Sequence, residues 1–104
     1  MSAAELLKRL PQALNADAAA GIDCTIQFAC QPPVYARIRD GRCQVGDGIT
    51  RAPDLTITMD DDDLVSLLKG ELNAMSAYLQ GRLQVDGDLL LAQRMPALFD
   101  SGKF

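Results

Sequence analysis

Four consecutive aspartates at positions 60–63 form the most conspicuous run of side chains that could bind a ligand. Glu71 falls at the twelfth position counted from Asp60, which is the spacing of an EF-hand calcium loop. The other positions do not fit, because Leu64 stands at the fifth, where an oxygen ligand belongs, and Val65 at the sixth, where glycine makes the turn. We therefore expect Asp60 to cap a helix, with the rest of the run in its first turn, and we predict no metal site.

Catalytic groups are scarce in this sequence, which contains no histidine. The commonest general base, and the usual partner of a serine or cysteine nucleophile, is therefore missing. The acids Asp40, Asp47, Asp86 and Asp88 stand at expected turns and helix starts, where capping of local backbone groups explains them. The glycines on either side of Asp47 match no phosphate-binding loop. We predict no catalytic residue and no cofactor, so an enzymatic function is the weakest of the alternatives.

The three cysteines, Cys24, Cys30 and Cys43, show no C-x-x-C spacing, and there is no histidine to complete a zinc site. Cys24 and Cys30 fall on one expected strand, about 20 Å apart when extended, so they cannot form a disulfide with each other. We expect buried free thiols and a reducing compartment.

Composition limits the chain to one globular domain, residues 1–104, with 48% hydrophobic and 23% charged residues. The formal net charge of −4 disfavours binding of the whole protein to nucleic acid. The first residues lack the pattern of a secretory signal, and no apolar run is long enough to span a membrane. We therefore expect a soluble, cytoplasmic protein.

The first half of the chain predicts one helix and three strands. Leucines at helical spacing predict an amphipathic helix over residues 3–14, which Pro11 ends or kinks. Alternation predicts a strand over residues 22–28 with its second face in water, and further strands over 34–39 and 42–45 joined by an Asp40-Gly41 hairpin turn. The inward residues of the first strand are expected to be Ile22, Cys24, Ile26 and Phe28.

The second half begins with a strand over residues 55–59 and then changes to helical periodicity. Two helical stripes follow, made of Leu64, Leu67 and Leu68 and of Met75, Tyr78 and Leu79. After a last strand with Leu83 and Val85, Asp88 is expected to cap a closing helix with Leu91, Met95, Leu98 and Phe99 on one face. Strands that are apolar on one face, followed by clustered helices, predict an α/β (α+β) fold with a mostly antiparallel sheet covered on one side.

Residues 52–99 resemble the second half of the sterol carrier protein 2 domain family. The strand Pro53-Asp54-Leu55-Thr56-Ile57-Thr58-Met59, an acidic helix start, Gly70-Glu71-Leu72-Asn73 and a helix bearing Tyr78 follow one another as they do in that family. The family's Gly-[Lys/Arg]-Leu-x-Val-x-Gly-Asp segment is matched by Gly81-Arg82-Leu83-Gln84-Val85-Asp86-Gly87-Asp88. Residues 1 to about 50 agree mainly in the order of helix, strand and hairpin.

The resemblance implies a five-stranded, mostly antiparallel sheet with helices on one face and an apolar tunnel between them. It implies non-catalytic binding and intracellular transfer of a fatty acid, acyl-CoA, phospholipid or sterol-like ligand. The inward positions that match the family, and so the candidate ligand-binding residues, are Met59, Leu64, Leu68, Leu72, Met75, Leu79, Leu83, Val85, Leu91, Met95 and Leu98. The methionines among them suit a pocket that adapts to a flexible chain.

Two features depart from the family pattern. Pro96 lies inside the closing helix, and the sequence ends in Gly102-Lys103-Phe104 where peroxisomal relatives end in Ser-Lys-Leu, so the resemblance implies a bacterial-type cytoplasmic member.

The expected partners are a lipid or other apolar small molecule, a membrane in transient contact, and a second copy of the chain or another protein. The alternative function is an accessory or scaffold domain of a lipid or quinone biosynthesis complex, because similar domains also occur in ubiquinone synthesis and at the C-terminus of alkyl sulfatases.

Overall fold

The computed structural model describes residues 2–104. The strands are β1 (Cys24–Ala29), β2 (Val34–Arg39), β3 (Arg42–Asp47), β4 (Leu55–Thr58) and β5 (Gln84–Gly87). The helices are α1 (Ala3–Leu7), α2 (Leu10–Ala13), α3 (Asp61–Leu68), α4 (Ala74–Leu79), α5 (Leu89–Leu98) and the 3₁₀ turn η1 (Ser101–Lys103).

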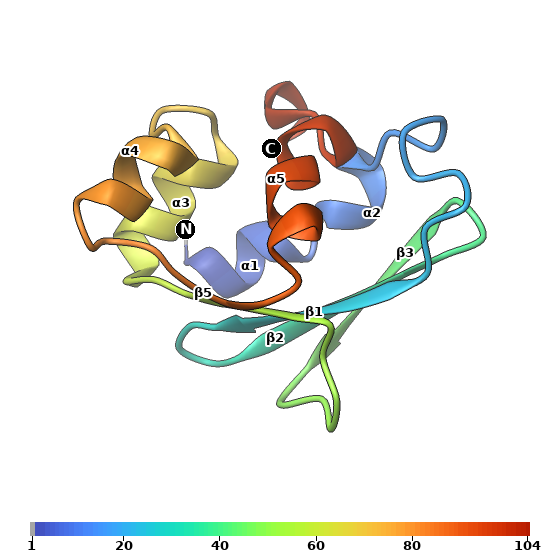
Figure 1. The fold of residues 1–104 in the computed structure, drawn as a ribbon, viewed down its shortest axis with the longest axis horizontal. Coiled ribbons are helices and arrows are strands. Elements are labelled where there is room, and N and C mark those ends of the chain that lie inside the picture. The colour runs from blue at the N-terminus through green and yellow to red at the C-terminus, as the bar shows by residue number, and fades with distance from the viewer. Residues whose placement is uncertain (1) are drawn as a thin grey trace.

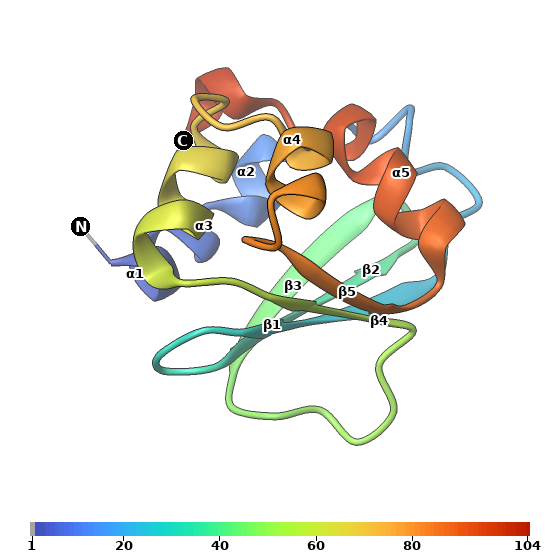
Figure 2. The same cartoon turned by 60° about the vertical axis from the view of Figure 1, so that its left-hand side comes forward.

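One mixed sheet runs in the order β3-β2-β1-β4-β5. Only the central β1–β4 pair is parallel, and the other pairs are antiparallel. The helices gather over one face of this sheet, as Figures 1 and 2 show. The predicted α/β class, with a mostly antiparallel sheet and helices on one side, is confirmed.

The β2–β3 hairpin turns at Asp40 and Gly41, as the sequence predicts. Both residues have positive φ, 55° and 71°, which is the conformation of a two-residue type I′ turn. The turn fixes a register in which Ile38 faces Cys43 and Ala36 faces Val45. The apolar side chains of both strands therefore point to the helix side.

The expected single N-terminal helix is wrong, because the structure divides it into α1 and α2. Pro11 has no backbone N–H to donate to the carbonyl of Leu7, so a continuous helix would lack a bond at this point. Pro11 instead stands in the first turn of α2, where a missing N–H costs nothing. Both short helices still bury leucines, namely Leu6, Leu7 and Leu10, all at 0% exposure.

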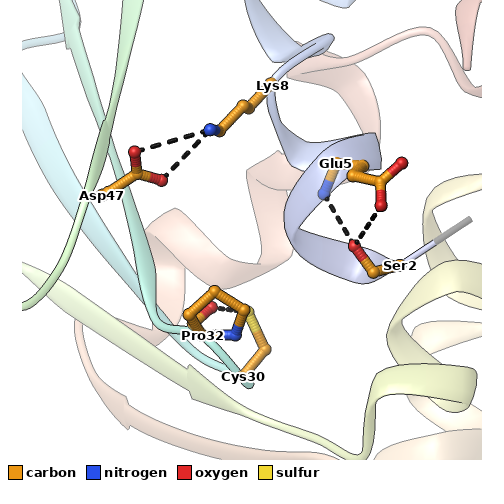
Figure 3. Close-up of polar contacts among 6 residues, drawn as sticks. All are labelled: Ser2, Glu5, Lys8, Cys30, Pro32 and Asp47. Carbon is orange, nitrogen blue, oxygen red and sulfur yellow. Dashed lines mark hydrogen bonds and ion pairs between the residues drawn. The ribbon is translucent and has the colours of Figure 1, made fainter.

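Polar contacts involve the residues at both ends of α1 (Figure 3). The Ser2 hydroxyl accepts a bond from the Glu5 backbone N–H at 3.2 Å and donates to the Glu5 carboxylate, so Ser2 caps the helix. At the other end, Lys8 Nζ lies 3.3 Å from a carboxylate oxygen of Asp47 at the end of β3. Both partners are exposed, so this pair adds little stability and mainly marks where α1 meets the sheet.

The second face of β1 is not in water, contrary to the sequence-based expectation. Thr25 and Gln27 are buried because the connection between β3 and β4 lies over them. The Gln27 side chain accepts from the Thr50 N–H at 2.7 Å and donates to the Gly48 carbonyl at 3.1 Å, while the Asp54 carboxylate accepts from the Thr25 N–H at 2.8 Å. Figure 1 shows this connection projecting from the sheet face opposite the helices.

The core lies between the sheet and the helices, where α2 packs against β3 and α1 packs against α3. Its largest fully buried side chain is Phe28, from β1. Around it lie Leu6, Leu7, Leu10, Ile26, Val34, Ile38, Leu55, Leu64 and Leu98. Within residues 2–104, no helix is long and apolar enough to cross a membrane.

Candidate ligand-binding site

Helix α4 presents most of its apolar side chains to solvent. Asn73 caps it by accepting from the Ser76 N–H at 3.1 Å, so the helix starts where the sequence predicts. Ala77 is its single fully buried residue, whereas Met75, Tyr78 and Leu79 are 61%, 52% and 76% exposed. Three large apolar side chains of one short helix are thus left without cover by the rest of the described residues.

The first turn of α5, which follows β5 in the chain, also exposes apolar side chains. The Asp88 carboxylate accepts from the backbone N–H groups of Leu90 and Leu91 at 3.0 and 3.1 Å, which confirms the predicted cap. Leu91 is buried, but Leu89 and Leu90 are 57% and 72% exposed. The four-residue strand β5 connects the end of α4 to the start of α5, and both helices lie on the same face of the sheet (Figure 2).

The structure places nine of the eleven predicted lining residues in or against the core. Six are buried, namely Met59, Leu64, Leu68, Leu83, Leu91 and Leu98. Three are half-buried and pack against that core, namely Leu72, Val85 and Met95. The half-buried three come from the α3–α4 connection, β5 and α5.

The expected inward orientation of Met75 and Leu79 is wrong. A helix that turns Ala77, and in part Ala74, toward the core must turn Met75 and Leu79 to the opposite side, because residues repeat every 3.6 positions. Two small side chains let α4 sit close to the core, and the larger pair is left outside.

Sequence reasoning missed Leu89 and Leu90 as members of this surface. A signal was present, because three successive leucines at positions 89–91 cannot all point to one side of a helix. Leu89 and Leu90 could therefore not both share the core-facing side with Leu91. Ala77 was missed as well, since a short side chain gives no hydrophobic stripe of its own.

Two open hollows lie on the surface of the described residues, and neither has the expected tunnel lining. The first, about 520 Å³, lies where β1 and β4 end and α3 begins, and Met59 is the one predicted lining residue in it. Its other walls include Cys30, Thr58, Asp60, Asp61, Asp63, Gly81 and Arg82. The second, about 460 Å³, lies on β2 and β3.

The aspartate run around the first hollow ties α3 to its neighbours. The Asp61 carboxylate accepts from the backbone N–H of Ala3 at 3.4 Å and of Gln31 at 3.3 Å. Asp63 pairs with Arg82, whose Nε donates at 3.3 Å, and this guanidinium lowers the pKa of Asp63 below its ordinary value.

The prediction that the Asp60 side chain caps a helix is right in position but wrong in the expected hydrogen bond. Asp60 occupies the N-cap position of α3, but its side chain accepts no capping hydrogen bond. Residues 2–104 contain no group of three acidic, cysteine or histidine side chains placed to share a metal ion.

The three cysteines are buried free thiols, as predicted. Burial, followed by the charge of Asp54, raises the pKa of Cys24 to about 11, and burial likewise raises the pKa of Cys43 to about 11. Burial also raises the pKa of Cys30, whose thiol donates to the Pro32 carbonyl at 3.2 Å (Figure 3). All three thiols are therefore protonated, and weak nucleophiles, at neutral pH.

Comparison with known families matches residues 3–100 to the model of the SCP-2 sterol transfer family. Among curated proteins, the chain is 41% identical over 63 residues to peroxisomal multifunctional enzyme A of Dictyostelium discoideum, which covers 61% of this chain and 14% of that protein. It is 36% identical over 61 residues to sterol carrier protein 2 of Rattus norvegicus, covering 59% of this chain and 11% of that protein. The chain thus spans less than a fifth of the length of these relatives.

Solved structures share the fold at lower identity. The sec-alkylsulfatase Pisa1 from Pseudomonas sp. superposes with a TM-score of 0.76 at 22% identity, over 91% of this chain and 16% of that one. Palmitated SCP2L2 from Aedes aegypti gives 0.68 at 20% identity, over 91% of both chains. The ubiquinone synthesis protein UbiJ-SCP2 gives 0.68 at 17% identity, over 89% of this chain and 85% of that one.

Proposed function

The chain belongs to the SCP-2 sterol transfer family, and on that premise we propose that it is a lipid carrier. The proposed ligand is an acyl-chain lipid, bound between the helices and the β4–β5 side of the sheet and transferred in that bound form. The observation that carries the proposal is the exposed apolar surface on α4 and the first turn of α5. We call this surface, made of Met75, Tyr78, Leu79, Leu89 and Leu90, the apolar rim.

The apolar rim lies beside side chains that a ligand would cover further. Leu72, Val85 and Met95 are half-buried against the core, so an acyl chain placed there removes their remaining surface from water as well as its own. Burial of apolar surface contributes about 25 cal/mol per Å², so a long chain binds without any catalytic group. The eleven residues predicted from the sequence remain the proposed lining, with Met75 and Leu79 at the rim.

Helix α4 is the element that would admit the ligand. Ala77 is its one fully buried residue, so displacing the helix uncovers little apolar surface. Gly70 and Gly81, on either side of it, both have positive φ, 79° and 75°, and form the ends about which it would move. We expect the chain to bind palmitate, since a neighbour of the same fold is described as palmitated.

The proposed function involves no chemical step by this chain. The sequence has no histidine, and the thiols are protonated at neutral pH. Some relatives of the family are parts of enzymes, but the chain matches only a small share of their length.

A fluorescent fatty-acid displacement assay on delipidated protein tests the proposal. The variant L89S/L90S removes apolar surface at the rim, and Ile49→Ser is its matched control, because Ile49 is 80% exposed on the β3–β4 connection at the opposite face. We expect palmitate to displace the probe from the native protein and from Ile49→Ser, with affinity reduced about tenfold in L89S/L90S, in proportion to the apolar area lost. Equal affinity in all three proteins contradicts the placement, and no saturable binding contradicts the function.

A second candidate is an accessory domain whose apolar rim is covered by a partner protein. The fold shared with UbiJ-SCP2, a ubiquinone synthesis protein, favours this alternative. Native mass spectrometry of the chain purified from its own host separates the two. Co-purified lipid supports the carrier, whereas a lipid-free chain in a heteromeric complex supports the accessory domain.

A further inference from the structure

Three arginines gather on the sheet face opposite the helices, at the tip of the β2–β3 hairpin. The alternation of each strand places them there, because Ala36, Ile38 and Cys43 are buried toward the helices and the residues between them point the other way. In the register of the hairpin, Arg39 lies directly opposite Arg42, and Arg37 lies opposite Gln44. These four side chains and Asp40 line a hollow of about 460 Å³, which we call the arginine hollow.

The opposition of Arg39 and Arg42 costs stability, because like charges directly across a strand pair repel. Charged residues on an edge strand do protect a sheet from pairing with other chains, and β3 is such an edge. That role explains one charge on β3. It does not explain why the strand beside it places two more arginines on the same face.

Neighbouring groups hold one of the arginines and leave the other two available. Arg37 donates to the Thr25 hydroxyl and to the Asp23 carboxylate, both at 3.3 Å, so its guanidinium is fixed at one side of the hollow. Arg39 has only a loose partner, with 3.8 Å between its Nε and the carboxylate of Asp40. Arg42 forms no ion pair with any other residue in the described part of the chain.

Two carboxylates form ion pairs with these arginines. Asp23 pairs with Arg37 and Asp40 pairs with Arg39, so Arg42 is left as the arginine without an ion pair among the described residues, and the Asp40 side chain is 87% exposed. The chain as a whole carries −4, so this face is the exception in an acidic protein. The type I′ turn at Asp40 and Gly41 fixes the register of the two strands, so the backbone positions of Arg39 and Arg42 lie opposite each other.

We infer that the arginine hollow binds a phosphate group. The guanidinium groups of Arg39 and Arg42 hold the phosphate, and Arg37 and Gln44 form the neighbouring wall of the hollow. Planar guanidinium groups bind phosphate oxygens through two parallel hydrogen bonds, and an anion between Arg39 and Arg42 removes their repulsion. The phosphate belongs either to a free phosphate compound or to a lipid headgroup. The site lies on the opposite face from the apolar rim, so it stands independently of the proposed lipid function.

Isothermal titration of the full chain with pyrophosphate at low ionic strength, against chloride of equal ionic strength, tests the free form. Flotation with phosphatidylcholine vesicles, with and without phosphatidic acid, tests the headgroup form. The variants are Arg39→Gln and Arg42→Gln, and the matched control is Arg94→Gln, an exposed arginine on α5 whose loss changes net charge equally.

We expect saturable 1:1 binding that weakens about tenfold in Arg39→Gln and Arg42→Gln and is retained in Arg94→Gln, as for loss of one bidentate contact. Binding of pyrophosphate assigns the site to a free phosphate compound, and binding of phosphatidic acid vesicles alone assigns it to a headgroup. Absence of both, or an equal loss in Arg94→Gln, overturns the inference.

Thermal unfolding gives a second readout that a merely structural role would not give. Because Arg42→Gln relieves repulsion across the strands, its unfolding midpoint should stay equal to or above that of the native protein while phosphate binding falls. A lowered midpoint together with unchanged binding also overturns the inference. Fatty-acid displacement should be the same in Arg42→Gln and native protein, so failure of this site and failure of the lipid site are distinguishable.

Discussion

The core beneath β1–β3 and the region around α4, β5 and α5 carry similar apolar patterns but are covered very differently. Beneath β1–β3, side chains such as Leu7, Ile26 and Ile38 are 0% exposed. Around β5, Leu79 and Leu90 are more than 70% exposed although each belongs to an apolar helix. Periodicity states which side chains share a face of an element, and packing by the rest of the chain decides whether that face is buried. The uncovered region is therefore the one in which we propose that a ligand binds.

The largest contrast between the two regions should appear on truncation of one side chain in each. Ile38→Ala leaves a cavity under a closed core and should destabilise the protein by about 2–5 kcal/mol. Leu79→Ala removes an exposed side chain and should change the free energy of unfolding by no more than about 0.5 kcal/mol. Urea unfolding followed by circular dichroism measures both, and similar losses would show that the rim is part of the core.

Enlarging Ala77, the buried residue of α4, tests whether this helix packs against the core through that residue. Ala77→Leu forces three extra carbon atoms into a site with no exposure and should cost about 1–3 kcal/mol. Ser76→Leu, one position earlier on the exposed side, is the matched control and should be nearly neutral. The same urea titrations compare them, and an unchanged midpoint for Ala77→Leu would mean that α4 does not rest on Ala77.

The two helix starts that carry an aspartate at the N-cap should respond differently to its loss. Asp88→Ala removes a carboxylate that accepts two backbone N–H bonds and should cost about 0.5–2 kcal/mol. Asp60→Ala removes a side chain with no capping bond and should cost less than about 0.5 kcal/mol. Equal losses, measured by thermal unfolding, would show that Asp60 caps α3 in solution.

The smallest expected effect is the pH dependence of the Asp63–Arg82 pair, which joins α3 to the start of β5. Arg82 lowers the pKa of the Asp63 carboxyl in the folded state. The pair therefore stabilises the folded protein fully above the unfolded pKa of Asp63, about 4, and this stabilisation is lost as the pH falls through the folded-state pKa. The stability difference between the native protein and Asp63→Asn should shrink below about pH 4. Asp62→Asn, in the same helical turn, controls for the helix dipole and should show a weaker pH dependence.

What the sequence predicted well was decided by neighbours along the chain. Asp40 and Gly41 form the hairpin turn because both tolerate positive φ, and Asp88 caps α5 because its carboxylate reaches N–H groups two and three residues later. The family resemblance extended this local agreement to a five-stranded, mostly antiparallel sheet with helices on one face.

The features that the sequence predicted poorly depend on contacts between segments that are distant in the chain. The orientation of α4 depends on the close approach of Ala77 to the core, which no periodicity reveals. The burial of Gln27 depends on Thr50, which lies 23 positions away.

The parallel pairing of β1 with β4 also has a consequence for synthesis of the chain. The antiparallel meander β1–β2–β3 is complete at Asp47, but β4, which pairs with the other edge of β1, begins only at Leu55. Until the ribosome has released those later residues, Ile26 and Phe28 lie on a strand with one unpaired edge, which is the kind of segment that seeds aggregation of nascent chains. The β3–β4 connection, which bonds to Gln27 and Thr25, is the first part of the chain that can cover the outer face of that strand.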